Sequence, residues 1–69
     1  MLKIKDIEKN QIIYAMDDYG ESYSFKASKP VCIDGKWQVE AEDSGNYSYT
    51  FFEEDESILF IDDTLGEAS

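Results

Sequence analysis

The sequence predicts an all-β protein: a small antiparallel β-barrel or strongly curved sheet of six or seven short strands, of SH3-like or OB-like size. Three observations favour this class. Apolar and polar residues alternate over much of the chain, β-branched and aromatic residues are frequent, and turn-forming residues separate the alternating runs. The length of 69 residues suits a single domain over 1–65 with a frayed tail over 66–69.

The first half of the chain predicts three strands joined by turns. Residues 1–7 alternate apolar and charged side chains, as a half-buried strand does. Residues 12–16 and 22–27 continue this pattern on either side of a hairpin connection that contains Gly20. In the third strand the side chains expected to face the core are Tyr23, Phe25 and Ala27.

The dipeptide Asp34-Gly35 predicts a two-residue hairpin turn, because both central positions of such a turn need a positive φ. Pro30 suits the first residue of the strand before it, since proline has no N–H to give to a ladder. Cys32, the only cysteine, is expected to be a small buried hydrophobe on that strand. The returning strand, 36–42, is expected to direct Trp37, Val39 and Ala41 inward and Lys36, Gln38, Glu40 and Glu42 outward.

Two apolar runs, residues 47–52 and 58–61, flank four consecutive carboxylates. Both runs favour strands because they are rich in aromatic and β-branched residues. A helix that begins at Asp55 and ends at Gly66 is the alternative, but it would place two aspartates at its negative C-terminal end. We therefore expect a strand after the acidic cluster, whose members are Glu53, Glu54, Asp55 and Glu56.

The negative charge is concentrated in the second half of the chain. Residues 1–36 carry six acids and six lysines, whereas residues 37–69 carry ten acids and no base, which accounts for the net charge of −10. Binding to nucleic acid needs a basic face, so a basic DNA-binding protein or enzyme is the better partner. The alternative is that the acids only keep a small aromatic-rich domain in solution.

The residue types exclude most catalytic chemistry. The chain has no His, one Cys and no Gly-rich phosphate loop, and a carboxylate pair of the glycosidase kind needs a cleft that so short a chain can hardly form. The acids around Gly20 and Gly45 do not match the twelve-residue calcium loop. We expect no enzyme activity, cofactor or metal. Without a signal peptide or a membrane-spanning run in the sequence, we expect a cytoplasmic protein with no membrane partner.

The acids can imitate a nucleic-acid backbone. Glu40 and Glu42 lie two positions apart on a strand, a rise of about 6.7 Å, which is of the order of the distance between successive phosphates. Such a protein would occupy the DNA-binding groove of its target and block it. The carboxylates expected to extend this row are Glu53, Glu54, Glu56, Asp62 and Asp63.

The segment Glu56 to Leu59, ESIL, resembles the edge-strand motif of phage uracil-DNA glycosylase inhibitors, which are small acidic DNA mimics. The resemblance covers these four residues. It implies a phage or mobile-element protein in which Glu56 and Ser57 contact the enzyme, while Ile58 and Leu59 support a pocket for an apolar side chain of the enzyme. Asp62 and Asp63 resemble the acids that follow the motif in that family.

A second class of function stays open. A small β-barrel can bind a peptide or a partner subunit through exposed aromatic side chains without any mimicry of DNA. The candidates for such contacts are Tyr19, Tyr47 and Tyr49.

Overall fold

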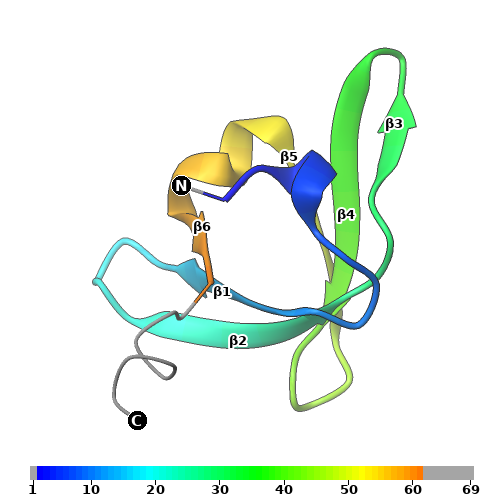
Figure 1. The fold of residues 1–69 in the computed structure, drawn as a ribbon. Coiled ribbons are helices and arrows are strands. Elements are labelled where there is room, and N and C mark those ends of the chain that lie inside the picture. The colour runs from blue at the N-terminus through cyan, green and yellow to red at the C-terminus, as the bar shows by residue number, and fades with distance from the viewer. Residues whose placement is uncertain (1, 62–69) are drawn as a thin grey trace, which may run out of the picture.

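The computed structural model describes residues 2–61, which form a strongly curved antiparallel sheet that does not close into a barrel (Figure 1). The predicted all-β class is confirmed. In this part of the chain no helix is long and apolar enough to cross a lipid bilayer. The elements are η1 (Ile4–Asp6), β1 (Ile12–Met16), β2 (Ser22–Ala27), β3 (Val31–Ile33), β4 (Lys36–Glu42), β5 (Ser48–Phe52), η2 (Glu53–Ile58) and β6 (Leu59–Phe60).

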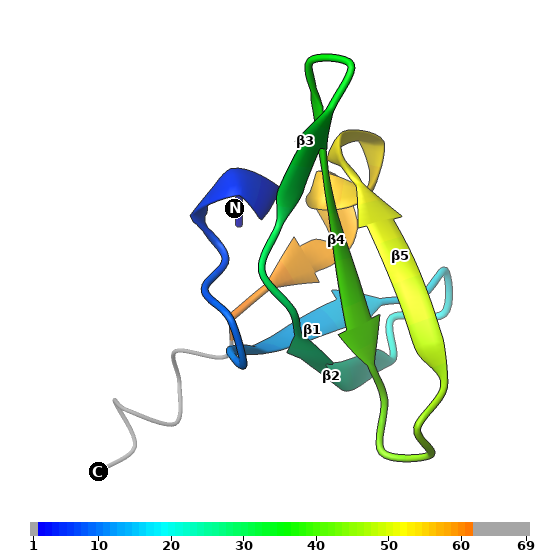
Figure 2. The ribbon, with the colours of Figure 1, turned by 90° about the vertical axis from the view of Figure 1, so that its right-hand side faces the viewer.

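Strand β4 is the centre of the sheet. One edge of β4 pairs with β3 near its start and with β2 near its end, while the other edge pairs with β5. Strand β1 lies between β2 and β6, so the last strand returns to the first. In Figure 1 the β3–β4 hairpin extends beyond the rest of the sheet, and Figure 2 shows β3, β4 and β5 side by side.

The turns follow the predicted chemistry. Asp34 and Gly35 have φ angles of 53° and 79°, so the two-residue hairpin is confirmed. Asp17 and Asp43 organise the two other hairpin turns through their side chains. The Oδ1 atom of Asp17 accepts two backbone N–H groups of the β1–β2 turn, and the Oδ1 atom of Asp43 accepts two in the β4–β5 loop.

The core lies against the concave face of the sheet and is apolar throughout. Phe25 makes edge-to-face contacts with Phe51 and Tyr49, with ring centroids 5.2 Å apart in both pairs. Trp37 is partly buried and packs against this core, in agreement with its predicted inward position. The buried apolar residues are Leu2, Ile4, Ile7, Ile13, Ala15, Phe25, Ala27, Val39, Ala41, Phe51 and Leu59.

One predicted strand is wrong in its backbone conformation, and another is shorter than predicted. Residues 2–7 bury Leu2 and Ile4 as expected, but they do so through the single 3-10 turn η1 and pair with no strand of the described chain. The strand expected after the acidic cluster is present as β6, but it is limited to Leu59–Phe60, because Ile58 belongs to the 3-10 helix η2 together with the acidic cluster and Ser57. No α-helix is found over residues 55–61, and the region after Ile61 lies outside the described residues.

Two side chains predicted to be buried are exposed. Tyr23 is 49% exposed because it lies beside the β1–β2 turn, where its hydroxyl reaches the turn carboxylates. Cys32 is exposed because β3 pairs only with β4, in the part of the hairpin that extends beyond the body of the sheet. Alternation along a strand predicts the face of a residue correctly, but it does not predict whether anything covers that face.

Candidate functional site

Three of the four carboxylates of the acidic cluster are held by backbone N–H groups of the fold. Glu53 Oε1 accepts the N–H of Trp37 at 2.8 Å, and Asp55 Oδ2 accepts that of Phe52 at 2.9 Å. Glu56 Oε2 accepts the N–H of Ile4 at 2.8 Å, across 52 positions of sequence. These carboxylates therefore satisfy donors that the sheet leaves free, a structural role that the sequence analysis did not identify.

Among the predicted contact acids that lie within residues 2–61, Glu56 is the most enclosed. Its side chain is 15% exposed, and its Oε1 atom lies 3.7 Å from Lys3 Nζ. Glu54, on the same 3-10 helix, is exposed, and its carboxylate has no hydrogen bond or ion pair within residues 2–61. Of the acidic cluster, Glu54 is thus the carboxylate that can bind a partner without breaking a hydrogen bond or ion pair within the described residues.

The ESIL segment is divided between surface and core. Ser57 and Ile58 are exposed, and they line a shallow hollow of about 270 Å³ together with Met16 and Phe60. Leu59 is only 2% exposed, so its side chain packs in the core and does not contact a partner directly. Asp62 and Asp63 lie outside the described residues.

Glu40 and Glu42, hereafter the acidic pair, lie on the outer face of β4, opposite to the core. Across the β4–β5 ladder, Glu40 faces Thr50 and Glu42 faces Ser48; on its other side Glu42 faces Lys26. Both glutamates are exposed, and neither makes an ion pair of 4 Å or less within residues 2–61. The structure therefore places both carboxylates on one solvent-facing surface, as the alternation predicted.

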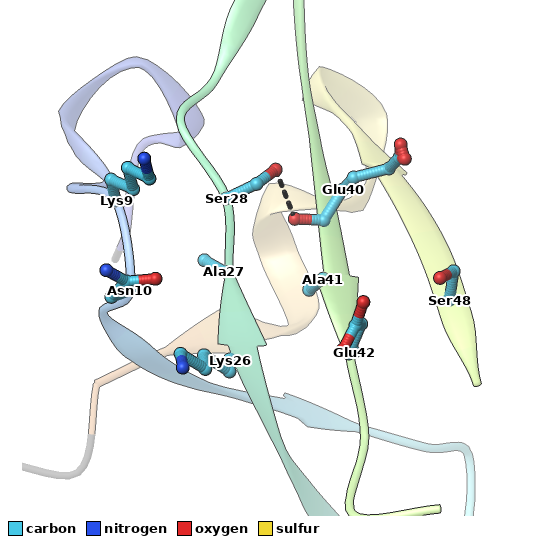
Figure 3. Close-up of a pocket in the computed structure, with 9 residues that line it drawn as sticks. All are labelled: Lys9, Asn10, Lys26, Ala27, Ser28, Glu40, Ala41, Glu42 and Ser48. Carbon is cyan, nitrogen blue, oxygen red and sulfur yellow. Dashed lines mark hydrogen bonds between the residues drawn. The ribbon is translucent and has the colours of Figure 1, made fainter. Parts of the chain in front are cut away.

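A polar hollow of about 310 Å³ borders the acidic pair (Figure 3). The view shows Lys9 and Lys26 on one side and the acidic pair on the other, with the carboxylate of Glu40 turned away from both lysines. The backbone of Glu40 is held by Ser28, whose N–H and hydroxyl both donate to the carbonyl oxygen of Glu40 at 2.8 Å. Because the side chain of Glu40 extends away from both lysines, its negative charge faces away from these bases.

Exposed apolar side chains lie on the same outer face, next to the acidic pair. Val31 and Phe52 stand on either side of Gln38 in one row across β3, β4 and β5, and Ile33 stands beside Lys36 in the next row. Their exposed fractions are 48% for Val31, 42% for Phe52 and 51% for Ile33. We call these three residues the apolar trio. The hairpin register set by Asp34-Gly35 contained the signal for this placement, because it puts Val31 opposite the outward-facing Gln38.

The tyrosines proposed for aromatic contacts are exposed, but they lie on different elements and do not form a single surface. Tyr19 is 92% exposed in the β1–β2 turn, and Tyr47 is 69% exposed in the loop before β5. Tyr49 is 45% exposed and contacts Phe25 with its ring edge. Within residues 2–61, no group of three or more His, Cys, Asp or Glu side chains is arranged to hold a metal ion.

The hydroxyl of Tyr23 lies within hydrogen-bonding distance of two carboxylates, 3.1 Å from Asp17 Oδ2 and 3.2 Å from Glu21 Oε2. The hydrogen bond to Asp17, then that to Glu21, and then the two negative charges raise the pKa of Tyr23 above its ordinary value of 10.0. A raised folded-state pKa means that this contribution to stability is complete below pH 10.0 and is lost as the pH rises through the folded value.

We expect Asp17→Asn to lower the pKa of Tyr23, because the change removes the first of these charges while keeping an oxygen that can accept the turn N–H groups. Asp18→Asn is the control, since Asp18 is exposed and makes no hydrogen bond to Tyr23. The measurement is an NMR titration of the tyrosine ring signals between pH 8 and 12. An unchanged Tyr23 titration in Asp17→Asn would contradict the assignment of the cause.

Comparison of the chain with protein-family models, with curated proteins and with solved structures finds no match.

Proposed function

We propose that this protein is an acidic DNA-mimic inhibitor that occupies the basic DNA-binding groove of a DNA-handling enzyme. The observation that carries the proposal is the acidic pair, Glu40 and Glu42, which is exposed on one face and unpaired within residues 2–61. Two carboxylates at a strand spacing of about 6.7 Å present negative charge at a repeat close to that of successive phosphates. The protein acts as a binding partner and has no enzyme activity of its own.

The surroundings of the acidic pair support this function. The opposing side chains on β5 are the small hydroxyl groups of Ser48 and Thr50, so nothing bulky screens the carboxylates on that side. The net charge of −10 adds a negative field over longer distances, which accelerates encounter with a basic protein. Glu54 is a further exposed acid, whereas Glu53 and Glu56 already hold backbone donors of the fold. The acidic pair therefore replaces the acidic cluster as the principal contact surface.

Uracil-DNA glycosylase is the first target to test, because of the ESIL resemblance. With Leu59 in the core, the residues of that segment available to an enzyme are Ser57 and the 40% exposed Ile58. We propose that these two residues make a secondary contact with the enzyme, beside the hollow that they line. We propose that the protein is a phage or mobile-element product that acts in the cytoplasm, where the target enzyme is also present.

We expect the double variant Glu40→Gln, Glu42→Gln to weaken inhibition by at least about 100-fold while the fold survives. Gln keeps the size and hydrogen-bonding capacity of Glu but removes the charge, and a charge-assisted contact is worth about 1.5 to 3 kcal/mol when desolvated. The measurement is the inhibition of a panel of DNA-handling enzymes, beginning with uracil-DNA glycosylase, together with circular dichroism of each variant.

The matched control is Glu8→Gln, Asp18→Asn. Both residues are exposed, and both come from the electrically balanced half of the chain. The control should inhibit as the wild type does. If the wild type inhibits no enzyme of the panel, or if both double variants lose inhibition equally, the mimic proposal fails.

A second candidate function is an interaction module that uses exposed aromatic side chains without mimicry. The exposure of Tyr19, Tyr47 and Tyr49, at 92%, 69% and 45%, favours it. The two functions differ in their response to salt. Binding through a basic groove weakens steeply as the ionic strength rises, whereas aromatic contacts change little.

A further inference from the structure

The outer face of β3, β4 and β5, which lie side by side in Figure 2, carries both apolar and charged residues along its length. Along β4 the outward positions run from Lys36 through Gln38 to the acidic pair, with Val31 and Phe52 on either side of Gln38. Apolar side chains of β3 and β5 thus flank β4 at Gln38, and the two carboxylates follow at the next two outward positions of β4. A surface that is only a solubilising acidic face would not need three exposed apolar residues beside its carboxylates.

We propose that this face binds an extended basic segment of the partner protein, in which an apolar side chain is followed two and four residues later by lysine or arginine. The apolar side chain contacts Val31 and Phe52, and the two cations contact Glu40 and Glu42 in turn. This inference rests on the proposed function, because it names the chemistry that the acidic pair recognises.

The spacing argues for an extended segment. Outward side chains on β4 repeat about every 6.7 Å, and side chains on one side of an extended peptide repeat at the same interval. Three contacts therefore align in register: the apolar contact at the Gln38 row, one cation at Glu40 and one at Glu42. An α-helix advances about 5.4 Å per turn, so its side chains fall progressively out of step with the strand.

The charges also fix which end of β4 the cations of the bound segment occupy. Lys36 lies beside Ile33 at the hairpin end, one row beyond Val31 and Phe52, while the acidic pair lies at the other end of β4. A segment bound with its cations toward Lys36 would meet like charge, so the order of apolar and basic residues matters as well as their number.

The test compares two peptides of the same composition by NMR titration at low salt. The ordered probe is Ser-Leu-Ser-Lys-Ser-Lys-Ser, and the rearranged probe is Ser-Lys-Ser-Leu-Ser-Lys-Ser. We expect the ordered probe to bind about fivefold more tightly, with the largest shifts at the amides of β4 and β5. The preference should disappear in Val31→Thr, Phe52→Ser.

The control is Ile12→Thr, Met16→Ser, which removes two apolar side chains from β1. Its exposed fractions, 48% and 41%, match the 48% and 42% of Val31 and Phe52. The control should keep the preference. All four positions are exposed, so the variants should fold, and the amide spectrum of each verifies this.

Three results would overturn the inference while leaving the mimic proposal to its own test in the enzyme panel. One is equal binding of the two probes. Another is binding of neither probe to a wild-type protein that inhibits an enzyme. The third is a set of shifts confined to the β3 edge, which would indicate strand addition beside β3 in place of binding on the face.

Discussion

Replacing Leu59 with Ala is expected to lower the free energy of unfolding by about 2 to 5 kcal/mol, the range for a large aliphatic side chain removed from a packed core. Leu59 is 2% exposed and belongs to the core cluster. A domain of this size has a total stability of only a few kcal/mol, so the variant should be partly or wholly unfolded at 37 °C. Urea denaturation followed by circular dichroism measures the loss.

The adjacent substitution Ile58→Ala is the control. Ile58 is 40% exposed, so it should cost less than about 1 kcal/mol. The two variants test whether adjacent residues of the ESIL segment differ in role, with Leu59 packed in the core and Ile58 exposed on the surface. Equal costs at the two positions would contradict this division.

Local signals predicted much of the fold. The Asp34-Gly35 turn fixed the β3–β4 register, and the alternation along 36–42 predicted which side chains of β4 face the core. Both features depend on residues close in sequence, where backbone preference and a two-residue period decide the outcome. The acidic pair is on the surface for the same reason.

The conformation of the acidic cluster could not be predicted in this way. Glu53 and Glu56 accept N–H groups from Trp37 and Ile4, at sequence separations of 16 and 52. Those donors are free only because neighbouring segments do not pair there, which is a property of the assembled sheet. The prediction that the four acids form one charged surface therefore missed that three of them accept hydrogen bonds within the fold.

The exposure of Cys32 and Tyr23 has a related cause. Each lies on the predicted inner side of its strand, but β3 extends past the body of the sheet and Tyr23 lies next to a turn. Strand length and curvature determine how far the core reaches, and neither is encoded in the alternation alone. Val31 and Ile33 are exposed for a different reason, because they lie on the outer face of the hairpin, opposite to the core.

Replacing Glu56 with Ala is expected to destabilise the protein by about 2 kcal/mol, because a hydrogen bond to a charged acceptor is worth about 1.5 to 3 kcal/mol. The change leaves the N–H of the fully buried Ile4 without its acceptor and removes the ion pair with Lys3. The N-terminal segment, which contributes Leu2, Ile4 and Ile7 to the core, then loses its polar attachment to η2. Thermal unfolding should show a fall in Tm of about 8 to 16 °C.

Two variants separate the hydrogen bond from the charge. Glu56→Gln keeps a neutral acceptor for the Ile4 N–H but loses the charge of that acceptor and the 3.7 Å contact with the exposed Lys3, so it should cost about 1 kcal/mol, less than Glu56→Ala. Glu54→Ala removes a charge from the same 3-10 helix, where no hydrogen bond holds it within residues 2–61, and should be close to neutral. If Glu54→Ala and Glu56→Ala had the same effect, the charge of the cluster, and not the attachment of the N-terminal segment, would set the stability. If Glu56→Gln instead retains most of the stability that Glu56→Ala loses, the principal role of Glu56 is to accept the N–H of Ile4 and hold the N-terminal segment in place.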